Sequence, residues 1–229
     1  MNSARGNCVA ISEKLALCAL HSGGNVGTNV TVTTDGGKKL KAKIVFNRYE
    51  SGVVDISVLE LEKDFKFENF IATHHTPLGL LEKIYVFGRK LENDRPENFS
   101  AGGEVNCVVE NCSIVQSNYP GCKGLSGAPV VTVIENNELR VVGVHVGVHG
   151  ESADLTAGSD DDELNEPATR ADVSDAISTL SHASHGLSTY AMICDLARVR
   201  PLMTFLKKRC SASTSSNATK ATGTKRKRN

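Results

Sequence analysis

The sequence predicts an all-β protein, either a barrel or a sandwich, on three observations. Short runs rich in Val, Ile, Leu and Thr recur along much of the 229 residues, with turn-forming residues between them. One of these turns contains Asp35-Gly36, a dipeptide typical of tight β-hairpins. Helical spacing of apolar residues is confined to short stretches in the last third of the chain. Evenly spaced short strands with few helices are typical of β-barrels and β-sandwiches.

The expected strands form two sets, separated by a mixed segment at 62–80 that carries Pro77 and Gly79. The first set is bounded by Gly-rich turns at 22–25, 35–37 and 51–52, because glycine adopts the backbone angles that tight turns need. The second set includes one hairpin whose turn is the polar segment 135–138. The expected strands are 7–11, 14–20, 30–34, 40–49 and 54–61, then 83–88, 105–109, 113–116, 128–134, 139–148 and 188–194.

Three segments depart from the strand pattern. Asp195 can cap a helix that reaches Lys207, in which the apolar residues share one face and Pro201 could introduce a kink. Residues 151–186 are expected to form an acidic loop, with one short helix near 173–180. Residues 211–229 are almost without apolar side chains and end in a basic cluster at 225–228, so a disordered basic tail is expected.

Composition excludes several classes of protein. The 26 basic and 26 acidic residues cancel, so the whole molecule is not a polyelectrolyte binder. No apolar run is long enough to cross a membrane, and the N-terminus does not resemble a secretory signal, so a soluble protein is expected. Seven cysteines without a framework spacing favour reduced thiols and an intracellular, reducing setting, the cytoplasm.

The most informative motif is Gly124-Leu125-Ser126-Gly127-Ala128-Pro129, which places a serine between glycines just before an apolar strand. Glycines let the backbone fold closely around the serine, so that amide N–H groups can point at a reacting oxygen. The motif resembles the nucleophile turn of chymotrypsin-like serine proteases. Cys122 is an alternative nucleophile, but it lies four residues before Ser126 and outside the glycine-flanked position.

Two upstream residues extend the resemblance in the order that this family uses. His21 follows the apolar run 15–20 and precedes Ser22-Gly23-Gly24, which resembles the histidine segment of the family. Asp55 lies among apolar neighbours in 53–61, where an unpaired carboxylate would be costly to bury and an imidazole N–H would satisfy it. The separations, 34 residues from His21 to Asp55 and 71 from Asp55 to Ser126, resemble those of compact viral members.

The resemblance implies two six-stranded-type antiparallel β-barrels, a C-terminal helix and a disordered basic tail. The N-terminal barrel would span 1–70, a linker 71–82, the C-terminal barrel with its acidic loop and helix 83–210, and the tail 211–229. Ser126 would be the nucleophile, His21 the general base and Asp55 the residue that orients His21. The N–H groups of Gly124 and Ser126 would form the oxyanion hole. Leu125 replaces the aspartate of trypsin-type zymogens, so activation by a new N-terminus is not expected.

A substrate pocket is implied by Gly143-x-His145-x-Gly147, which resembles Gly-x-His-x-Gly of picornavirus 3C-like and sobemovirus-like proteases. In those families the histidine hydrogen-bonds the Gln or Glu side chain before the cut. By that resemblance His145 would select Gln or Glu, and Val146 and Gly147 would line the substrate strand. The alternative is that His145 is a structural histidine of a barrel strand.

The sequence therefore predicts a serine endopeptidase that processes a viral polyprotein in the host cytoplasm, without a cofactor. No metal site is expected, because Cys107-x4-Cys112 and His182-x2-His185 do not form a closed ligand set. A cellular cytosolic trypsin-like peptidase and a catalytically silent binding module remain alternatives. The basic tail could be a solvated linker, a nuclear localisation signal or a weak nucleic-acid-binding segment.

Overall fold

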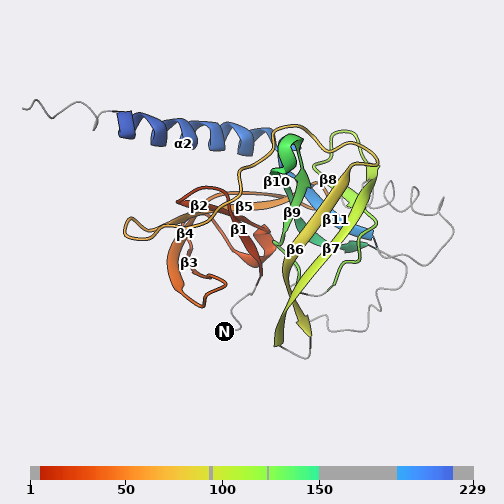
Figure 1. Cartoon of the computed structure of the whole chain (residues 1–229), viewed down its shortest axis with the longest axis horizontal. Coiled ribbons are helices and arrows are strands. Elements are labelled where there is room, and N and C mark those ends of the chain that lie inside the picture. The colour runs from red at the N-terminus through yellow and green to blue at the C-terminus, as the bar shows by residue number, and fades with distance from the viewer. Residues whose placement is uncertain (1–5, 93–94, 123, 150–189, 219–229) are drawn as a thin grey trace, which may run out of the picture.

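A computed structural model describes residues 6–92, 95–122, 124–149 and 190–218, and it confirms the all-β class (Figure 1). The acidic loop expected at 151–186 lies outside the described residues, and so do residues 219–229. The strands, in chain order, are β1 (Cys8–Ala10), β2 (Leu15–Cys18), β3 (Asn29–Thr33), β4 (Lys39–Glu50), β5 (Val54–Leu61), β6 (Lys83–Glu92), β7 (Arg95–Val108), β8 (Ile114–Ser117), β9 (Pro129–Val133), β10 (Leu139–His149) and β11 (Tyr190–Asp195).

The N-terminal unit is an antiparallel sheet of five strands in the order β1-β2-β5-β4-β3. Its core is buried on one side, where alternate residues of β4 such as Leu40, Ala42 and Ile44 face inward. The resemblance implied a six-stranded barrel here, but the unit is an open half-barrel. Residues 62–82, which separate β5 from β6, form no closing strand; their one strand-like pairing is an isolated bridge between Thr73 and Val141.

The C-terminal unit is a closed six-stranded barrel in the order β10-β11-β8-β7-β6-β9. Its core gathers residues from every wall, including Ile84, Val130 and Ile193. The hairpin of β6 and β7 is longer than the sequence predicts and projects beyond the barrel (Figure 1). Its projecting part is largely exposed, so it lacks the apolar alternation by which strands are predicted.

The C-terminal helix begins as expected, at a cap formed by Asp195. The carboxylate accepts hydrogen bonds from the Ala197 N–H at 3.0 Å and the Leu78 N–H at 2.9 Å, and Arg198 donates to it at 3.0 Å. A short 3₁₀ turn, η3 (Leu196–Arg198), leads into helix α2 (Arg200–Ala218). Pro201 therefore lies in the first turn of α2, where proline is tolerated, and not at an internal kink.

Helix α2 also runs further than the sequence predicts. It includes residues 211–218, for which a disordered tail was expected from the lack of apolar side chains. Within the part of the chain that the structure describes, no helix is both long and apolar enough to cross a membrane.

Helix α2 lies along the N-terminal sheet and joins the two units (Figure 1). Phe205 packs against Phe46 of β4 with ring centroids 5.3 Å apart and the rings tilted by 38°, and Arg209 pairs with Glu60 of β5 at 2.7 Å. One apolar cluster contains Ile56 of the first sheet, Val144 of the barrel and Leu202 of α2. The two units are therefore packed together through one shared core.

Candidate active site

His21 lies just after β2 of the first sheet and faces Asp55 on the neighbouring strand β5. The buried strand β2 ends at Cys18, and the chain turns into the 3₁₀ segment η1 (Leu20–Ser22), which carries His21 outward. Asp55 is the second residue of β5, the neighbour of β2. The two side chains meet with His21 Nδ1 2.5 Å from Asp55 Oδ2.

The Asp55 carboxylate is well supplied with donors. Its Oδ1 accepts the backbone N–H of Leu20 at 2.6 Å and that of His21 at 3.3 Å. An ionised carboxylate can only accept, so the short contact requires that His21 Nδ1 carries a proton. This leaves Nε2, the other ring nitrogen, with the lone pair that a general base needs. The hydrogen bond to Asp55 raises the pKa of His21 above its ordinary 6.5, although burial acts in the opposite direction.

Ser126 lies in a tight turn held by backbone hydrogen bonds on both sides. The Leu125 N–H donates to Cys122 at 3.3 Å and the Ala128 N–H donates to Leu125 at 2.9 Å. Gly124 and Gly127 both have left-handed backbone angles, with φ of 87° and 80°. The two glycines predicted from the motif are therefore required by the conformation of this turn. Cys122 packs against the barrel core, as a small apolar residue does.

The Ser126 turn packs directly against the segment that carries His21. A side chain on Gly127 would place its Cβ 3.2 Å from the Ala19 nitrogen. A Cβ on Gly6 would lie 2.7 Å from the Ser22 hydroxyl and 3.2 Å from the Ser126 carbonyl oxygen. The structure thus brings the three predicted residues to one place. Among the residues described, neither the Ser126 hydroxyl nor His21 Nε2 makes a hydrogen bond.

The two amides predicted for the oxyanion hole are available. In the described part of the chain, no acceptor takes a hydrogen bond from the N–H of Gly124 or that of Ser126. The neighbouring amides of Leu125, Gly127 and Ala128 are all paired. Two unpaired N–H groups beside a serine are the arrangement that stabilises a tetrahedral oxyanion.

His145 is buried on β10 behind the Ser126 turn, with 1% of its surface exposed. Its backbone is bound to the turn, because the Gly127 N–H donates to the His145 carbonyl at 2.7 Å and the His145 N–H donates to Ala128 at 2.9 Å. Its Nδ1 lies 2.8 Å from the hydroxyl of Tyr119, which is fully buried. Burial, together with the charge of His21, lowers the pKa of His145 to about 4, so the ring is neutral near pH 7.

The tautomer of His145 follows from the partners of Tyr119. Burial raises the pKa of Tyr119, so the hydroxyl keeps its proton. Of the described residues, His145 alone is within hydrogen-bonding distance of that hydroxyl, so the arrangement that satisfies both groups has Tyr119 donating to Nδ1. His145 then presents Nε2–H as a donor, suited to a carbonyl or carboxylate oxygen.

Val146 and Gly147 lie in the part of β10 that pairs with β11 on one edge but no longer with β9 on the other. The pairing of β10 with β11 has a bulge between His145 and Gly147, which leaves Val146 as the extra residue. On its other side β10 pairs with β9 only as far as Val144. From Val146 onward this edge has no strand neighbour among the described residues, so an extended peptide could add to it.

Two residues at this site were not identified from the sequence. Tyr119 lies in a loop before the serine motif, and its buried hydroxyl is the partner of His145. A tyrosine this close in sequence to the motif is the signal that could have pointed to it. Asn7 contacts both the Ser126 turn and β6. No sequence signal marks Asn7, because its contact with Gly124 joins positions 117 residues apart.

Similarity to known proteins is found in the three-dimensional structure and not in the sequence. No protein-family model and no curated protein sequence matches this chain. Among solved structures, Kallikrein-related peptidase 10 matches with a TM-score of 0.55 and 13% identity, over 90% of this chain and 89% of its own. An inactive Ser-to-Ala mutant of Rv3671c, a protease of M. tuberculosis, matches with a TM-score of 0.50 and 15% identity, over 89% and 82%.

The fold is chymotrypsin-like. At these identities the likeness concerns the fold alone. The activity and its specificity therefore depend on the geometry of this chain's own residues.

Proposed function

We propose that this protein is a serine endopeptidase that hydrolyses peptide bonds through an acyl-enzyme on Ser126. The observation that carries the proposal is the 2.5 Å contact between His21 Nδ1 and Asp55 Oδ2, beside a turn that presents Ser126 and two unpaired amides. Nucleophile, base, orienting carboxylate and oxyanion donors are the parts that acyl transfer requires.

Each step of the reaction has a group to perform it. His21 Nε2 takes the proton from the Ser126 hydroxyl as the oxygen attacks the scissile carbonyl carbon. The carbonyl oxygen becomes an oxyanion and accepts hydrogen bonds from the N–H groups of Gly124 and Ser126. His21 then returns the proton to the leaving amine, and the acyl-enzyme forms. A water molecule, deprotonated by His21, releases the acid in the same way.

The specificity that we propose is for Gln or Glu before the cleaved bond. Support comes from His145, whose Nε2–H is left free to donate once Tyr119 has bonded Nδ1. A neutral imidazole donor suits the side-chain oxygen of Gln or Glu. It offers no charge partner for Lys or Arg, so the pocket does not favour a trypsin-like preference. The unpaired edge at Val146 and Gly147 would hold the substrate as an added strand.

The biological role that we propose is the processing of a viral polyprotein in the host cytoplasm. The proposal depends on the Gly143-x-His145-x-Gly147 segment and its resemblance to 3C-like proteases. A cellular peptidase of the same fold is the alternative, and the cleavage preference separates the two. Weak nucleic-acid binding through 225–228 also remains a proposal, tested by removing residues 219–229 and measuring binding at several salt concentrations.

Cleavage profiling tests the proposed function directly. The purified chain is incubated with a diverse peptide library, beside Ser126→Ala as the matched control, and products are sequenced by mass spectrometry. We expect cuts after Gln or Glu that disappear in Ser126→Ala. Cuts after other residues would overturn the specificity, and cuts that persist in Ser126→Ala would overturn the mechanism.

A catalytically silent binding module is the second candidate. It is favoured by one observation, the absence of a hydrogen bond between the Ser126 hydroxyl and His21 in the described structure. This candidate predicts that a folded chain cuts no peptide and forms no adduct with a serine-directed phosphonate. An adduct on Ser126 would exclude it.

A further inference from the structure

Asn7 makes hydrogen bonds to two parts of the molecule that are remote in sequence. Its side-chain amide donates to the Gly124 carbonyl at 2.8 Å, and its backbone N–H donates to the Ser126 carbonyl at 2.7 Å. Asn7 thus binds both residues whose N–H groups are free beside the nucleophile.

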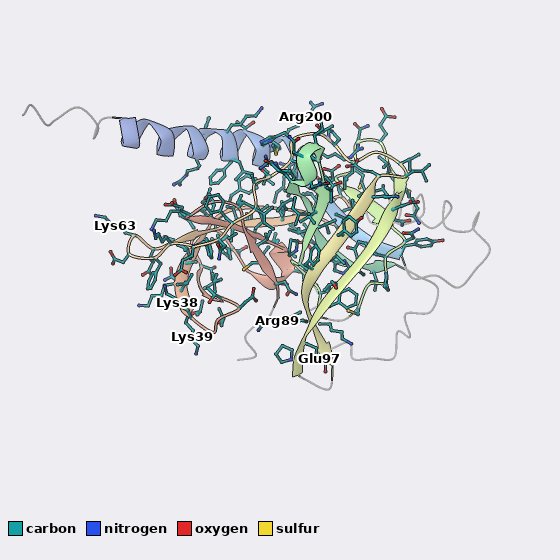
Figure 2. The ribbon with its side chains drawn as sticks, in the orientation of Figure 1. Lys38, Lys39, Lys63, Arg89, Glu97 and Arg200 are labelled. Carbon is teal, nitrogen blue, oxygen red and sulfur yellow. The ribbon has the colours of Figure 1, made fainter. Side chains whose placement is uncertain are left out.

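The same side chain is fixed to β6. Asn7 Oδ1 accepts the Arg89 N–H at 2.8 Å, and Nδ2 donates to the Arg89 carbonyl at 3.1 Å. Arg89 belongs to the hairpin of β6 and β7, near the end that projects beyond the barrel (Figure 2). Asn7 therefore connects the Ser126 turn by hydrogen bonds to a strand that is itself paired in the barrel.

Close packing surrounds these contacts. A Cβ on Gly127 would lie 2.0 Å from the Asn7 carbonyl oxygen, and one on Gly88 would lie 3.2 Å from Asn7 Oδ1. Glycines at both positions let the backbone of Asn7 enter between β6 and the turn. The contact of residues 6–7 with the turn is therefore built into the packing on both sides.

The turn needs such support because of its glycines. Gly124 can adopt backbone angles on either side of φ = 0, so its peptide groups can rotate at little cost. A planar peptide joins the C=O of one residue to the N–H of the next, so the bonds of Asn7 fix the 124–125 and 126–127 peptide planes. The plane that carries the Ser126 N–H lies between these two, and the plane that carries the Gly124 N–H adjoins the first, so Asn7 restricts both donors through their neighbouring planes.

We propose that Asn7 is a positioning residue that holds the Gly124 and Ser126 amides in the geometry of an oxyanion hole. The inference rests on the proposed function, and it assigns to the segment before β1 a part in the reaction. Asn7 touches neither the substrate nor the reacting atoms. It acts through the turn, so its loss should reduce transition-state stabilisation more than substrate binding.

The test compares two esters of the same preferred peptide, one with a carbonyl oxygen and one with sulfur in its place. An oxyanion hole favours the oxygen ester, because the larger sulfur anion accepts hydrogen bonds poorly. Wild type, Asn7→Ala and Asn7→Asp are assayed, each below its own Tm measured by circular dichroism. Asn7→Asp keeps the acceptor for the Arg89 N–H but turns an oxygen toward the Gly124 and Arg89 carbonyls, so it remains informative if the alanine variant does not fold.

Thr132→Val is the matched control, since it removes a 3.0 Å side-chain bond to the Lys83 carbonyl in the same barrel. For Asn7→Ala and Asn7→Asp we expect kcat for the oxygen ester to fall about tenfold to a hundredfold, less than the outright loss of one donor. KM should change less than about threefold, and the preference for oxygen over sulfur should shrink by the same factor as kcat, as expected when a transition-state interaction alone is lost. Thr132→Val should leave both kcat and the preference unchanged.

Two results would overturn the role of Asn7 while leaving the proposed function intact. One is an active wild type with both variants retaining kcat and the oxygen preference. The other is an equal loss on both esters, which indicates a structural role only. A folded wild type that hydrolyses neither ester and takes no phosphonate label would overturn the proposed function, and the role of Asn7 with it.

Discussion

At the scale of single residues, the proposed chemistry depends on which nitrogen of His21 is left free. Asp55 accepts hydrogen bonds from the Leu20 and His21 backbone as well as from the imidazole, so its position is determined by the start of η1. His145 is held in an analogous way by Tyr119. In both pairs a partner occupies Nδ1, so Nε2 is the nitrogen left for chemistry, in the proposed function once as a base and once as a donor.

The pH dependence of activity follows from the first pair. His21 must be neutral to accept the Ser126 proton, and Asp55 raises its pKa above 6.5. Activity should therefore rise with pH through a pKa above that value. Asp55→Asn removes the cause, so the acid limb of kcat/KM should move to lower pH while the maximal rate falls about 10⁴-fold. An acid limb that stays in place in Asp55→Asn would show that Asp55 does not act on His21.

The second pair determines selectivity. Tyr119→Phe removes the donor to Nδ1 of His145, so the imidazole can adopt the tautomer that lacks a proton on Nε2. We expect the preference for Gln or Glu over Ala before the cut to fall about tenfold, equivalent to about 1.4 kcal/mol, the size of one hydrogen bond. Phosphonate labelling of Ser126 should change little. Unchanged selectivity, measured as the ratio of kcat/KM values, would exclude the pocket assignment.

At the scale of elements, the site depends on the approach of the Ser126 turn to the strands around it. Gly127 has a φ of 80°, and a Cβ added to it would lie 2.0 Å from the backbone carbonyl oxygen of Asn7. Gly37 has almost the same angle, 79°, but no other group lies within 4 Å of the point where a Cβ on Gly37 would stand. An alanine would meet backbone strain at both positions but close packing only at Gly127, so comparing the two distinguishes these effects.

Gly127→Ala and Gly37→Ala form a matched pair. Each should lose about 1–2 kcal/mol because alanine is strained at these angles. Gly127→Ala should lose further stability, because its Cβ would meet the Asn7 carbonyl at 2.0 Å and the backbone must shift. Urea unfolding measures both. Equal losses in the two variants would mean that the turn does not pack on Asn7 as described.

Most strands and the Ser126 turn could be predicted from the sequence, because the residue patterns that indicate them are local. The apolar and β-branched run at 40–49, bounded by turn residues, predicted β4, and the glycines around Ser126 predicted the turn. The open first sheet could not be predicted, because whether residues 62–82 form a strand depends on their packing between the two units. Residues such as Asn7 and Tyr119 carry no local pattern, and their roles arise from contacts with residues distant in the chain.

At the scale of the whole molecule, the two β units are joined by a helix that follows the second unit in sequence but packs on the first. Leu202 of α2 is fully buried in the cluster that includes Ile56 and Val144, one from each unit. The cluster contains the sequence neighbours of Asp55 and of His145, and it holds the sheet of Asp55 against the barrel of Ser126.

Leu202→Ala tests this arrangement. Removing a fully buried leucine should destabilise the protein by about 2–5 kcal/mol, since it loses apolar burial and leaves a cavity. Thr204→Ala, an exposed change on the same helix, should stay within about 0.5 kcal/mol. Urea unfolding compares the two. A loss below about 1 kcal/mol in Leu202→Ala would show that α2 does not contribute to the shared core.

The most direct measurement of the central claim is covalent labelling of the folded chain with a fluorophosphonate, followed by mass spectrometry of the labelled peptide. We expect one adduct per chain, on Ser126, absent in Ser126→Ala and slowed by orders of magnitude in His21→Ala, where turnover should fall about 10⁶-fold. Labelling at another residue, or labelling of Ser126 at an unchanged rate in His21→Ala, would contradict that claim.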